Sequence, residues 1–435
     1  MLSKKKVINI QSSIKKAFGR LSHLAETLIG SEIVRLGADI KEKINKGEKI
    51  YNFTIGDFDS SIFPIPKKFE DEIIDAYKDH HTTYPPAEGI LALRESVSKF
   101  INKREGLDYD ASEILIAAGG RPLIYALYRA LIDKDDKVIY SVPSWNNNHY
   151  VHFVEGQHVV IEAVAENNFM PLAEDIKPHL KGAVLIALCS PLNPTGTIFK
   201  KKELEDICDM VLQENMLRGE AEKKLYVMYD QMYWTLTYGD SVHYNPVTLR
   251  PEMKDYTIFI DGISKSFAAT GVRVGWALGP KHVLVKMKAI NSHVGAWSPM
   301  AEQHATAKYL LQTEAIDTYF VHYKKELEDR LRLIHEGFQK LKAEGFSVDS
   351  IAPQAAIYLT IQINLTGRKA GDKILTEQKD VTEYILNEAK LAVVPFYAFG
   401  ASKHSNWYRL SVGTCKKEEI KEMLEKLKEA LKKIV

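Results

Sequence analysis

The sequence predicts an α/β protein with a mostly parallel central sheet flanked by helices, together with a second, smaller α/β domain. The first observation is that short apolar runs alternate with amphipathic segments between residues 110 and 280. Strands that alternate with helices in this way form parallel sheets. The second observation is that the pattern turns helical after Pro280 and then returns to three apolar runs before a charged closing segment. We therefore expect two bodies with a cleft between them.

Six apolar runs are predicted strands of the larger sheet, and two of them, 183–191 and 224–230, are almost continuously apolar. Such runs are typical of parallel strands that are buried on both faces. The predicted strands are residues 114–120, 137–143, 183–191, 224–230, 257–260 and 272–278. Because ligands in such sheets bind at the carboxyl ends of the strands, the residues that follow these runs are the candidate functional residues.

The remaining periodic segments predict the helices and the smaller sheet. Helices are expected over residues 21–48, 71–80, 90–106, 122–132, 203–216, 300–341 with an interruption near Glu314, and 418–434. The smaller sheet is expected from residues 346–350, 355–363 and 392–396, and an exposed insertion from residues 367–380. The predicted division is an N-terminal arm and part of the small domain over residues 1–60, a large domain over 61–310 and a small C-terminal domain over 311–435.

The composition is that of an ordinary soluble protein of two or three domains, with 45% hydrophobic and 26% charged residues in a chain of 435. A net charge of +1 gives no general attraction to nucleic acid or to an anionic membrane. No apolar run approaches the length of a membrane span. Cys189, Cys208 and Cys415 are odd in number and form no CxxC motif, which argues against disulfides and zinc. A cytoplasmic location is expected.

The first 25 residues are basic and serine-bearing, and no acidic residue precedes Glu26, as in a mitochondrial presequence. The segment lacks the apolar core of a secretory signal. We interpret it as an N-terminal arm that packs on the body of the protein or on a partner subunit.

One lysine stands at the end of a predicted buried strand. Lys265 follows the run 257–260, lies between Ser264 and Ser266, and is followed eight residues later by Arg273. A lysine that is desolvated in such a turn shifts toward the neutral amine, which forms Schiff bases with aldehydes. Taken alone, a solvated loop lysine is the commoner interpretation, so the rest of the chain has to decide.

Two further strand ends carry groups suited to a phosphorylated aromatic ligand. Gly119 and Gly120 follow the first strand and Arg121 opens the next helix, which makes a small anion site at a helix N-terminus. Trp145 follows the second strand and could stack on an aromatic ring, although buried tryptophans more often belong to the core. The chain contains no GxGxxG motif, which disfavours a nicotinamide dehydrogenase.

The next two strand ends present an amide and a carboxylate. Residues 190–196, SPLNPTG, form a rigid turn around Asn193. Asp230 ends the following apolar run, where a carboxylate needs a buried cationic partner, and Tyr233 lies three residues further on. A Schiff-base lysine, a carboxylate for a protonated ring nitrogen, a stacking tryptophan and a phosphate site together describe pyridoxal 5′-phosphate.

Four strings of the sequence resemble, in order and spacing, those of the class I/II aminotransferases of fold type I, in particular the aspartate aminotransferase branch. The strings are SPLNPTG at 190–196, YDQMY at 229–233, SKSFAATGVRVGW at 264–276 and YRLSVG at 408–413. The resemblance extends from about Thr54 to the end of the chain. It implies the fold type I architecture, an enzyme that transfers amino groups, pyridoxal 5′-phosphate as the cofactor and a homodimer with shared active sites.

The resemblance also implies a role for each matching residue around the cofactor ring. Lys265 would hold the internal aldimine and move the substrate's proton. Asp230 would keep the pyridine nitrogen protonated. Asn193 and Tyr233 would hydrogen-bond the 3′-oxygen, and Trp145 would stack on the ring.

The phosphate and the substrate are implied to have their own residues. The phosphate would be held by Gly119, Gly120, Arg121 and Arg273. Tyr84 would reach toward the phosphate from a second subunit. Arg409 would bind the substrate α-carboxylate beside the amide of Gly56, with Trp145 and Asn193 also facing the substrate.

Two departures from the family pattern bear on specificity. A serine that often lies three residues before the lysine is replaced by Gly262, so one phosphate contact is lost unless Ser264 replaces it. The segment 289–301 offers His293 but no arginine for a distal carboxylate. Some bacterial aspartate enzymes place a basic residue directly after the glycine pair, and our hypothesis is that Arg121 binds the distal carboxylate of aspartate or glutamate. The alternative is that Arg121 serves only the phosphate.

The sequence therefore predicts an aminotransferase that moves the amino group of an L-amino acid, with aspartate as the leading donor, to 2-oxoglutarate by a ping-pong mechanism. The alternatives on the same fold are an aromatic or alanine transaminase and a carbon–sulfur lyase. A remote alternative is a cofactor-binding regulator without catalytic activity. No metal is expected, because the pairs His80–His81 and His149–His152 lack a third ligand and no HExxH motif occurs.

Overall fold

The computed structural model describes residues 21–28, 30 and 32–435, so most of the predicted N-terminal arm lies outside the described residues. The larger sheet has the strand order β2-β8-β7-β6-β5-β3-β4. The strands are β2 (Ile114–Ala117), β3 (Lys137–Val142), β4 (Gln157–Glu162), β5 (Ala183–Cys189), β6 (Tyr226–Asp230), β7 (Thr257–Gly262) and β8 (Gly275–Leu278). Only β8 runs antiparallel to its neighbours β2 and β7, which confirms the mostly parallel α/β sheet. Sequence reasoning missed β4.

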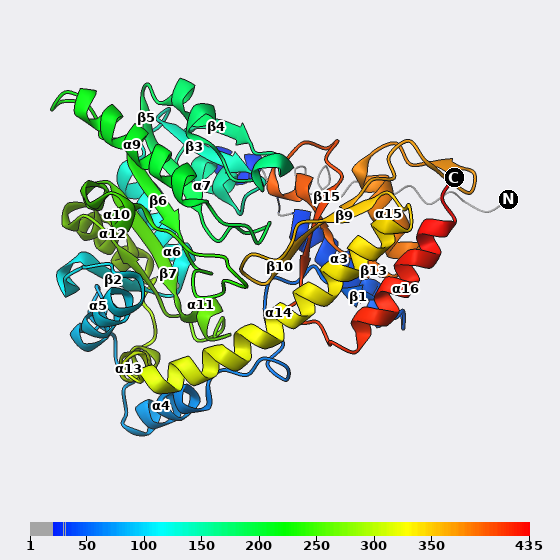
Figure 1. Cartoon of the computed structure of the whole chain (residues 1–435). Coiled ribbons are helices and arrows are strands. Elements are labelled where there is room, and N and C mark those ends of the chain that lie inside the picture. The colour runs from blue at the N-terminus through cyan, green and yellow to red at the C-terminus, as the bar shows by residue number, and fades with distance from the viewer. Residues whose placement is uncertain (1–20, 29, 31) are drawn as a thin grey trace.

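Both faces of this sheet are covered by helices (Figure 1). Apolar residues of α6 and α12 pack on one face, and those of α5 and α9 pack on the other, so successive residues along β7 and through the middle of β5 and β6 are buried. This explains why the predicted strands read as continuous apolar runs. The helices of this part are α4 (Lys67–Lys78), α5 (Leu91–Glu105), α6 (Gly120–Leu131), α7 (Asn147–Phe153), α8 (Ala173–Ile176), α9 (Lys201–Leu217), α10 (Pro246–Leu249), α11 (Ile263–Ser266), α12 (Lys281–Val294) and α13 (Met300–Leu310).

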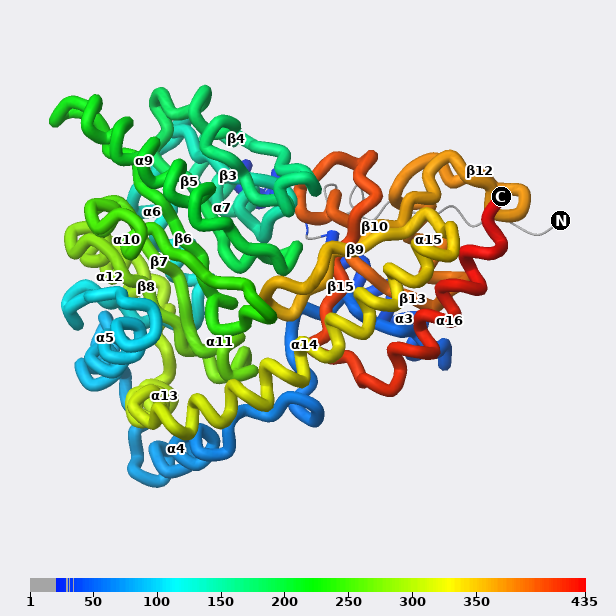
Figure 2. Tube along the Cα trace, viewed as in Figure 1, coloured from blue at the N-terminus to red at the C-terminus, as the bar shows by residue number. Residues whose placement is uncertain are grey.

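The smaller part combines segments from both ends of the chain, which lie side by side in Figure 2. Strand β1 (Tyr51–Asn52) pairs with β13 (Leu391–Ala392), and an antiparallel sheet has the order β14-β15-β10-β9. Its elements are α3 (Glu32–Asn45), β9 (Val348–Ser350), β10 (Tyr358–Ile363), β11 (Lys369–Ala370), β12 (Lys373–Ile374), α15 (Gln378–Glu388), β14 (Val394–Pro395), β15 (Trp407–Ser411) and α16 (Glu419–Lys432). The short helix α2 (His23–Thr27) lies instead against α7 of the larger part, where Thr27 Oγ1 is 3.3 Å from His152 Nε2. The boundaries proposed at residues 60 and 310 remain a prediction.

A single long helix, α14 (Thr313–Ala343), runs from the larger part to the smaller one (Figure 1). The sequence predicts one helical stretch with a break near Glu314, and α13 indeed ends at Leu310, three residues before α14 begins.

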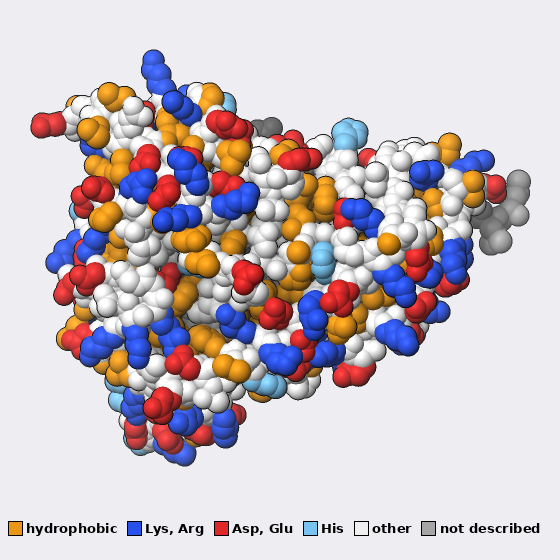
Figure 3. Space-filling view, viewed as in Figure 1, with side chains coloured by type: hydrophobic (Ala, Val, Ile, Leu, Met, Phe, Trp, Pro, Cys, Tyr) orange, Lys and Arg blue, Asp and Glu red, His pale blue; other side chains and the backbone are white. Residues whose placement is uncertain are grey.

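Short 3₁₀ segments complete the structure at η1 (Ala111–Glu113), η2 (Ala165–Asn167), η3 (Lys177–His179), η4 (Pro251–Asp255) and η5 (Phe396–Phe399). Among the described residues, no helix is long and apolar enough to span a bilayer. Basic and acidic side chains are intermixed over the face seen in Figure 3.

One predicted strand is shorter than expected. The run 272–278 is predicted to be a strand that contains Arg273, but β8 begins only at Gly275, and Arg273 has a left-handed backbone with φ of 63°. The turn lets the guanidinium fold back onto the carbonyl groups of Ala118 and Thr270, to which it donates at 2.7 Å each. The prediction of a strand over this run was therefore wrong about where the strand begins and correct about where it ends.

Phe267 connects the short helix α11 to the rest of the core. Its ring stacks on Phe320 of α14 at 5.6 Å between centroids and meets Tyr309 of α13 edge-on at 5.2 Å. We expect Phe267→Ala to lower the free energy of unfolding by about 3–5 kcal/mol, because it removes a fully buried ring that these helices share. Denaturant unfolding measures this loss. The control is Val321→Ala on the exposed face of α14, where the side chain is 74% exposed, and equal small losses in both variants would contradict the prediction.

Candidate active site

Lys265 is held inside the cleft between the two sheets. It lies on α11, directly after β7, and its Nζ donates a hydrogen bond to the carbonyl of Gly56 at 2.8 Å. The rings of Phe58 and Tyr233 lie 5.5 and 5.9 Å from the same nitrogen. Burial lowers the pKa of Lys265 to about 8, and nearby arginines add to the shift. The structure thus desolvates the lysine, as the strand-end position suggests.

Asp230 stands at the end of β6 without a cation beside it. Its Oδ1 accepts from the amide of Met232 at 3.1 Å, and within the described chain no lysine, arginine or histidine pairs with it. Burial raises the pKa of Asp230 to about 6. The buried cationic partner that the sequence requires is therefore not a residue of the described chain, and the carboxylate can accept a protonated group of a ligand.

The glycine turn that the sequence predicts to bind an anion lies at the N-terminus of α6. Gly119 adopts a φ of 87°, which glycine tolerates without strain, and α6 begins at Gly120. The Arg273 guanidinium, donating to the Ala118 carbonyl, is fixed beside this turn. The helix N-terminus and one guanidinium together make a site for an anion such as a phosphate.

Arg121 lies away from these backbone contacts. Its guanidinium sits 5.5 Å from the centre of the Trp145 ring, and the residue is exposed. It forms no hydrogen bond or ion pair with the part of the chain that the structure describes. Trp145 itself is half-buried beside Phe399. Arg121 and Trp145 therefore form one pair, and the guanidinium keeps its donors free for an anion.

Arg409 is a buried cation without a carboxylate partner among the described residues. It lies in β15, is only 2% exposed, and burial lowers its pKa. Its Nη1 donates to Asn193 Oδ1 at 3.1 Å and its Nη2 to the carbonyl of Thr54 at 2.6 Å, while Nε has no partner. The rings of Tyr358 and Phe399 flank the guanidinium at 4.7 and 4.9 Å. Such a group is suited to binding a carboxylate.

Sequence reasoning missed Tyr358. Its hydroxyl lies 2.6 Å from the hydroxyl of Tyr233, and so joins β10 to the segment after β6. A β-carbon on Gly56 would come within 2.8 Å of the same hydroxyl, so glycine at that position makes room for it. Tyr358 is the single aromatic residue in the apolar run 355–363, which is the only sequence signal that could have singled it out.

The structure places Tyr84 outside the site of its own chain, and it explains the glycine at position 262. Tyr84 is 85% exposed, its ring meets Trp297 at 5.3 Å, and it contacts none of the other predicted site residues. A β-carbon on Gly262 would lie 2.7 Å from the carbonyl oxygen of Val274, so the pairing of β7 with β8 leaves no room for a side chain such as serine at this position. Among the described residues, no group of three His, Cys, Asp or Glu side chains is placed to hold a metal ion.

Comparison with known proteins agrees with this geometry. The family model for aminotransferase class I and II matches residues 48–427. The chain belongs to this family. The aspartate aminotransferase of Geobacillus stearothermophilus is 30% identical over 401 residues, which cover 91% of this chain and 95% of the relative.

Two solved structures extend the comparison. That of the aspartate aminotransferase of Thermus thermophilus with maleate is 26% identical, with a TM-score of 0.83 over 95% of this chain and 100% of that one. That of the aromatic aminotransferase of Pyrococcus horikoshii is 25% identical, with a TM-score of 0.79 over 90% of this chain and 98% of that one. The protein is thus an enzyme of the aminotransferase type with the α/β fold of these enzymes.

The family implies pyridoxal 5′-phosphate, and the residues of this aminotransferase fit that group. Asp230 offers a buried carboxylate without a cation from the described chain. The turn at Gly119 and the guanidinium of Arg273 offer a phosphate site. Lys265 offers an amine that is neutral at moderately alkaline pH. These three features lie at the ends of neighbouring strands of one sheet.

The lowered pKa of Lys265 predicts how its reactivity depends on pH. Because the pKa is about 8, the amine loses its proton above that pH, whereas an exposed lysine does so near pH 10.4. In the cofactor-free aminotransferase, the rate of pyridoxal attachment to Lys265, trapped with borohydride and located by mass spectrometry, should rise up to about pH 8 and then level off. Attachment to the lysine of a short unstructured peptide should keep rising beyond pH 9. Parallel profiles for the two lysines would contradict the prediction.

Proposed function

We propose that this aminotransferase uses pyridoxal 5′-phosphate to move the amino group of a dicarboxylic L-amino acid such as aspartate to 2-oxoglutarate by a ping-pong mechanism. The observation that carries the proposal is that two guanidinium groups, that of the buried Arg409 and that of Arg121 on Trp145, have no carboxylate partner among the described residues. Aspartate, glutamate and their oxo acids each carry two carboxylates, and two guanidinium groups without carboxylate partners suit such substrates.

Arg409 and Arg121 bind different carboxylates of the substrate in this mechanism. Arg409 binds the α-carboxylate, using the Nε that is buried without a partner, while Asn193 and Thr54 keep its other nitrogens in place. Arg121 binds the distal carboxylate. Arg273 remains for the phosphate, because both of its terminal nitrogens are already fixed beside the glycine turn.

The remaining site residues move and stabilise protons. The pKa of Lys265 is about 8, so that about half of the amine is neutral at that pH. The neutral amine accepts the α-proton of the bound substrate and returns it when the product forms. When bound, pyridoxal 5′-phosphate supplies the electrophilic carbon and the electron-withdrawing ring. Asp230 holds the ring nitrogen in its protonated form. Tyr358 fixes the orientation of the Tyr233 hydroxyl from the opposite side of the cleft.

The proposal includes a homodimer. Tyr84 is an exposed aromatic residue on a loop and contacts no other predicted site residue of its own chain. In the proposed dimer Tyr84 reaches the phosphate of the partner's site. Size-exclusion chromatography with light scattering tests the dimer, and a monomer that retains full activity would overturn this part.

Replacing Arg121 with serine tests the dicarboxylate proposal. In the donor half-reaction, followed by the absorbance of the bound cofactor, the second-order rate constant for aspartate should fall roughly 100-fold or more, as expected for the loss of a charge pair. The rate constants for alanine and phenylalanine should change little. The matched control is Arg129→Ser on the exposed side of the same helix, where the side chain donates a hydrogen bond to the carbonyl of Phe153 at 3.3 Å.

Equal losses for all donors in Arg121→Ser would show that Arg121 serves the phosphate instead. A wild-type preference for phenylalanine over aspartate would favour an aromatic transaminase. Ammonia release without any oxo-acid acceptor would identify a carbon–sulfur lyase. The panel of donors therefore separates the three activities that this family of folds could host.

Replacing Lys265 with alanine tests the role of the cofactor. The wild-type protein should be yellow, and borohydride should fix the chromophore on Lys265. The Lys265→Ala protein should lose transfer activity by at least about 10⁴-fold, since the described part of the chain places no other amine at this position. Mass spectrometry of the reduced protein reads the site of attachment, and labelling at any other lysine would refute the assignment.

A further inference from the structure

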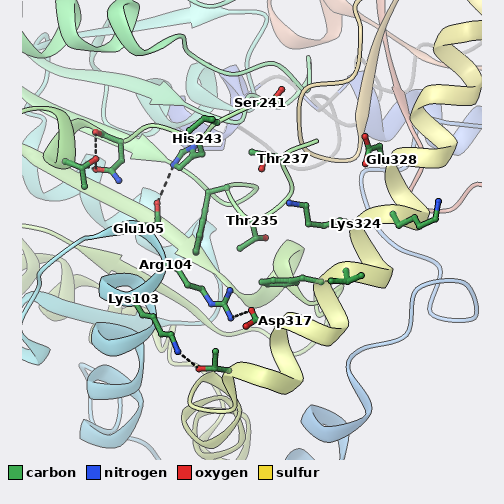
Figure 4. A pocket seen from close by; sticks show the side chains of 18 of the residues that line it. Lys103, Arg104, Glu105, Thr235, Thr237, Ser241, His243, Asp317, Lys324 and Glu328 are labelled. Carbon is green, nitrogen blue, oxygen red and sulfur yellow. Dashed lines mark hydrogen bonds and ion pairs between the residues drawn. The ribbon is translucent and has the colours of Figure 1, made fainter. Parts of the chain in front are cut away.

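A second cavity lies outside the proposed catalytic site, between the end of α5, the segment that follows β6, and the first half of α14 (Figure 4). Its volume is about 1190 Å³. We call it the α5–α14 groove. None of the residues assigned to the reaction lines it, and its walls come from both the large-sheet side and the helix that leads to the smaller part.

Two lysines in the groove have no carboxylate partner in the described part of the chain. Lys103 Nζ donates to the hydroxyl of Thr313 at 3.2 Å, and Lys324 makes no hydrogen bond or ion pair there. Burial lowers the pKa of Lys324 more than Glu328, one turn along α14, raises it. A partly buried ammonium without a counter-ion is costly, and an anion in the groove would remove that cost.

The floor of the groove carries buried polar groups without charge. Gln231 Nε2 donates to Glu105 Oε2 at 2.7 Å, and His243 Nε2 lies 3.4 Å from both Gln231 Oε1 and Glu105 Oε1. Burial raises the pKa of Glu105 to about 8 and lowers that of His243 to about 3, so both are neutral at pH 7. Glu105 Oε1 and His243 Nδ1 have no hydrogen-bond partner among the described residues. Glu105 and His243 therefore add no charge to the floor. Of the other carboxylates that line the groove, Asp317 pairs with Arg104 and Asp329 with Lys325, and Glu328 has no ion pair among the described residues.

Hydroxyl groups lie opposite the free lysine. Figure 4 shows the Lys324 side chain leaving α14 and entering the groove on the side where Thr235 and Thr237 lie. Thr237 and Ser241 also line the groove, and their hydroxyls make no hydrogen bond within the described ranges. Hydroxyl and ammonium donors together are a usual environment for carboxylate or phosphate oxygens.

The groove is connected to the catalytic segment by two hydrogen bonds. Thr235, in its wall, donates to the hydroxyl of Ser266 at 3.1 Å. Tyr323, which precedes Lys324 on α14, donates to the backbone carbonyl of Lys265 at 2.9 Å. A ligand that holds α14 against the opposite wall would therefore also hold the segment that bears the reactive lysine.

We propose that the α5–α14 groove binds a small organic anion with at least two carboxylate or phosphate groups, and that this anion holds α14 against the large-sheet side of the protein. Two anionic groups are required because the two unpartnered lysines belong to different walls, Lys103 to α5 and Lys324 to α14. The ligand acts beside the proposed reaction rather than in it.

Calorimetric titration tests the site. The probes are citrate and inorganic pyrophosphate, and the protein is the holoenzyme carrying Arg409→Leu, so that the substrate carboxylate site does not bind them. We expect saturable binding of at least one probe, and binding at least tenfold weaker when Lys103→Gln and Lys324→Gln are added. Lys340→Gln, the same change on an exposed part of α14, should leave the affinity unchanged. A preference for citrate identifies a carboxylate ligand, and a preference for pyrophosphate a phosphate ligand.

Hydrogen exchange in the wild-type holoenzyme provides a second measurement that does not depend on the Arg409 variant. The bound probe should slow exchange in residues 234–243 and 313–325, and the lysine double variant should lose this effect. No saturable binding, equal affinity in the double variant, or protection confined to the segments around Asn193 and Arg409 would overturn the proposal. Neither measurement needs turnover, so failure here leaves the aminotransferase proposal intact, and failure of that proposal leaves the groove testable.

Discussion

Asp230 and Arg409 are charged side chains that the described chain buries without giving either an opposite charge. An uncompensated buried ion costs several kcal/mol, and the surrounding packing has to hold it in place. Asp230 keeps one backbone amide as a donor, and Arg409 keeps two oxygen acceptors and two aromatic rings. A bound group that placed a protonated ring nitrogen beside Asp230 and a carboxylate beside Arg409 would recover this cost. Its binding would therefore stabilise the folded enzyme. The rest of the site follows from how the fold positions these two charges.

The site is assembled from both sheets at once. Asp230 belongs to the large sheet and Arg409 to the small one, and several direct contacts join the two sides, three of them between site residues. They are Lys265 to the Gly56 carbonyl, Tyr233 to Tyr358, and Asn193 to Arg409. Each of these contacts joins a strand end of the large sheet to the other side. The relative position of the two parts therefore determines the shape of the site.

The helix α14 is the other element that links the two parts. Its ring contacts reach Phe267 behind the catalytic segment, and Arg330, near its middle, donates to the carbonyl of Cys415 in the smaller part at 2.9 Å. The hydrogen bond from Tyr323 to Lys265 lies between these two anchors. A change in the angle of α14 would therefore move the hydrogen bond to the backbone of Lys265. The α5–α14 groove lies beside this hydrogen bond.

The sequence by itself determined the α/β class, the mostly parallel sheet and the strand-end positions of Lys265, Asp230 and Asn193, because strand periodicity and the residues at strand ends are local properties. Arg409 lies inside β15 and was singled out by the family resemblance. It did not determine the start of β8, the role of Tyr358 or the reason for Gly262, since these depend on contacts between segments distant in the chain. Only the tertiary structure decided that Arg273 turns back to the glycine turn while Arg121 stays with Trp145. The direction of a long side chain is set by its neighbours in space, and sequence spacing does not contain that information.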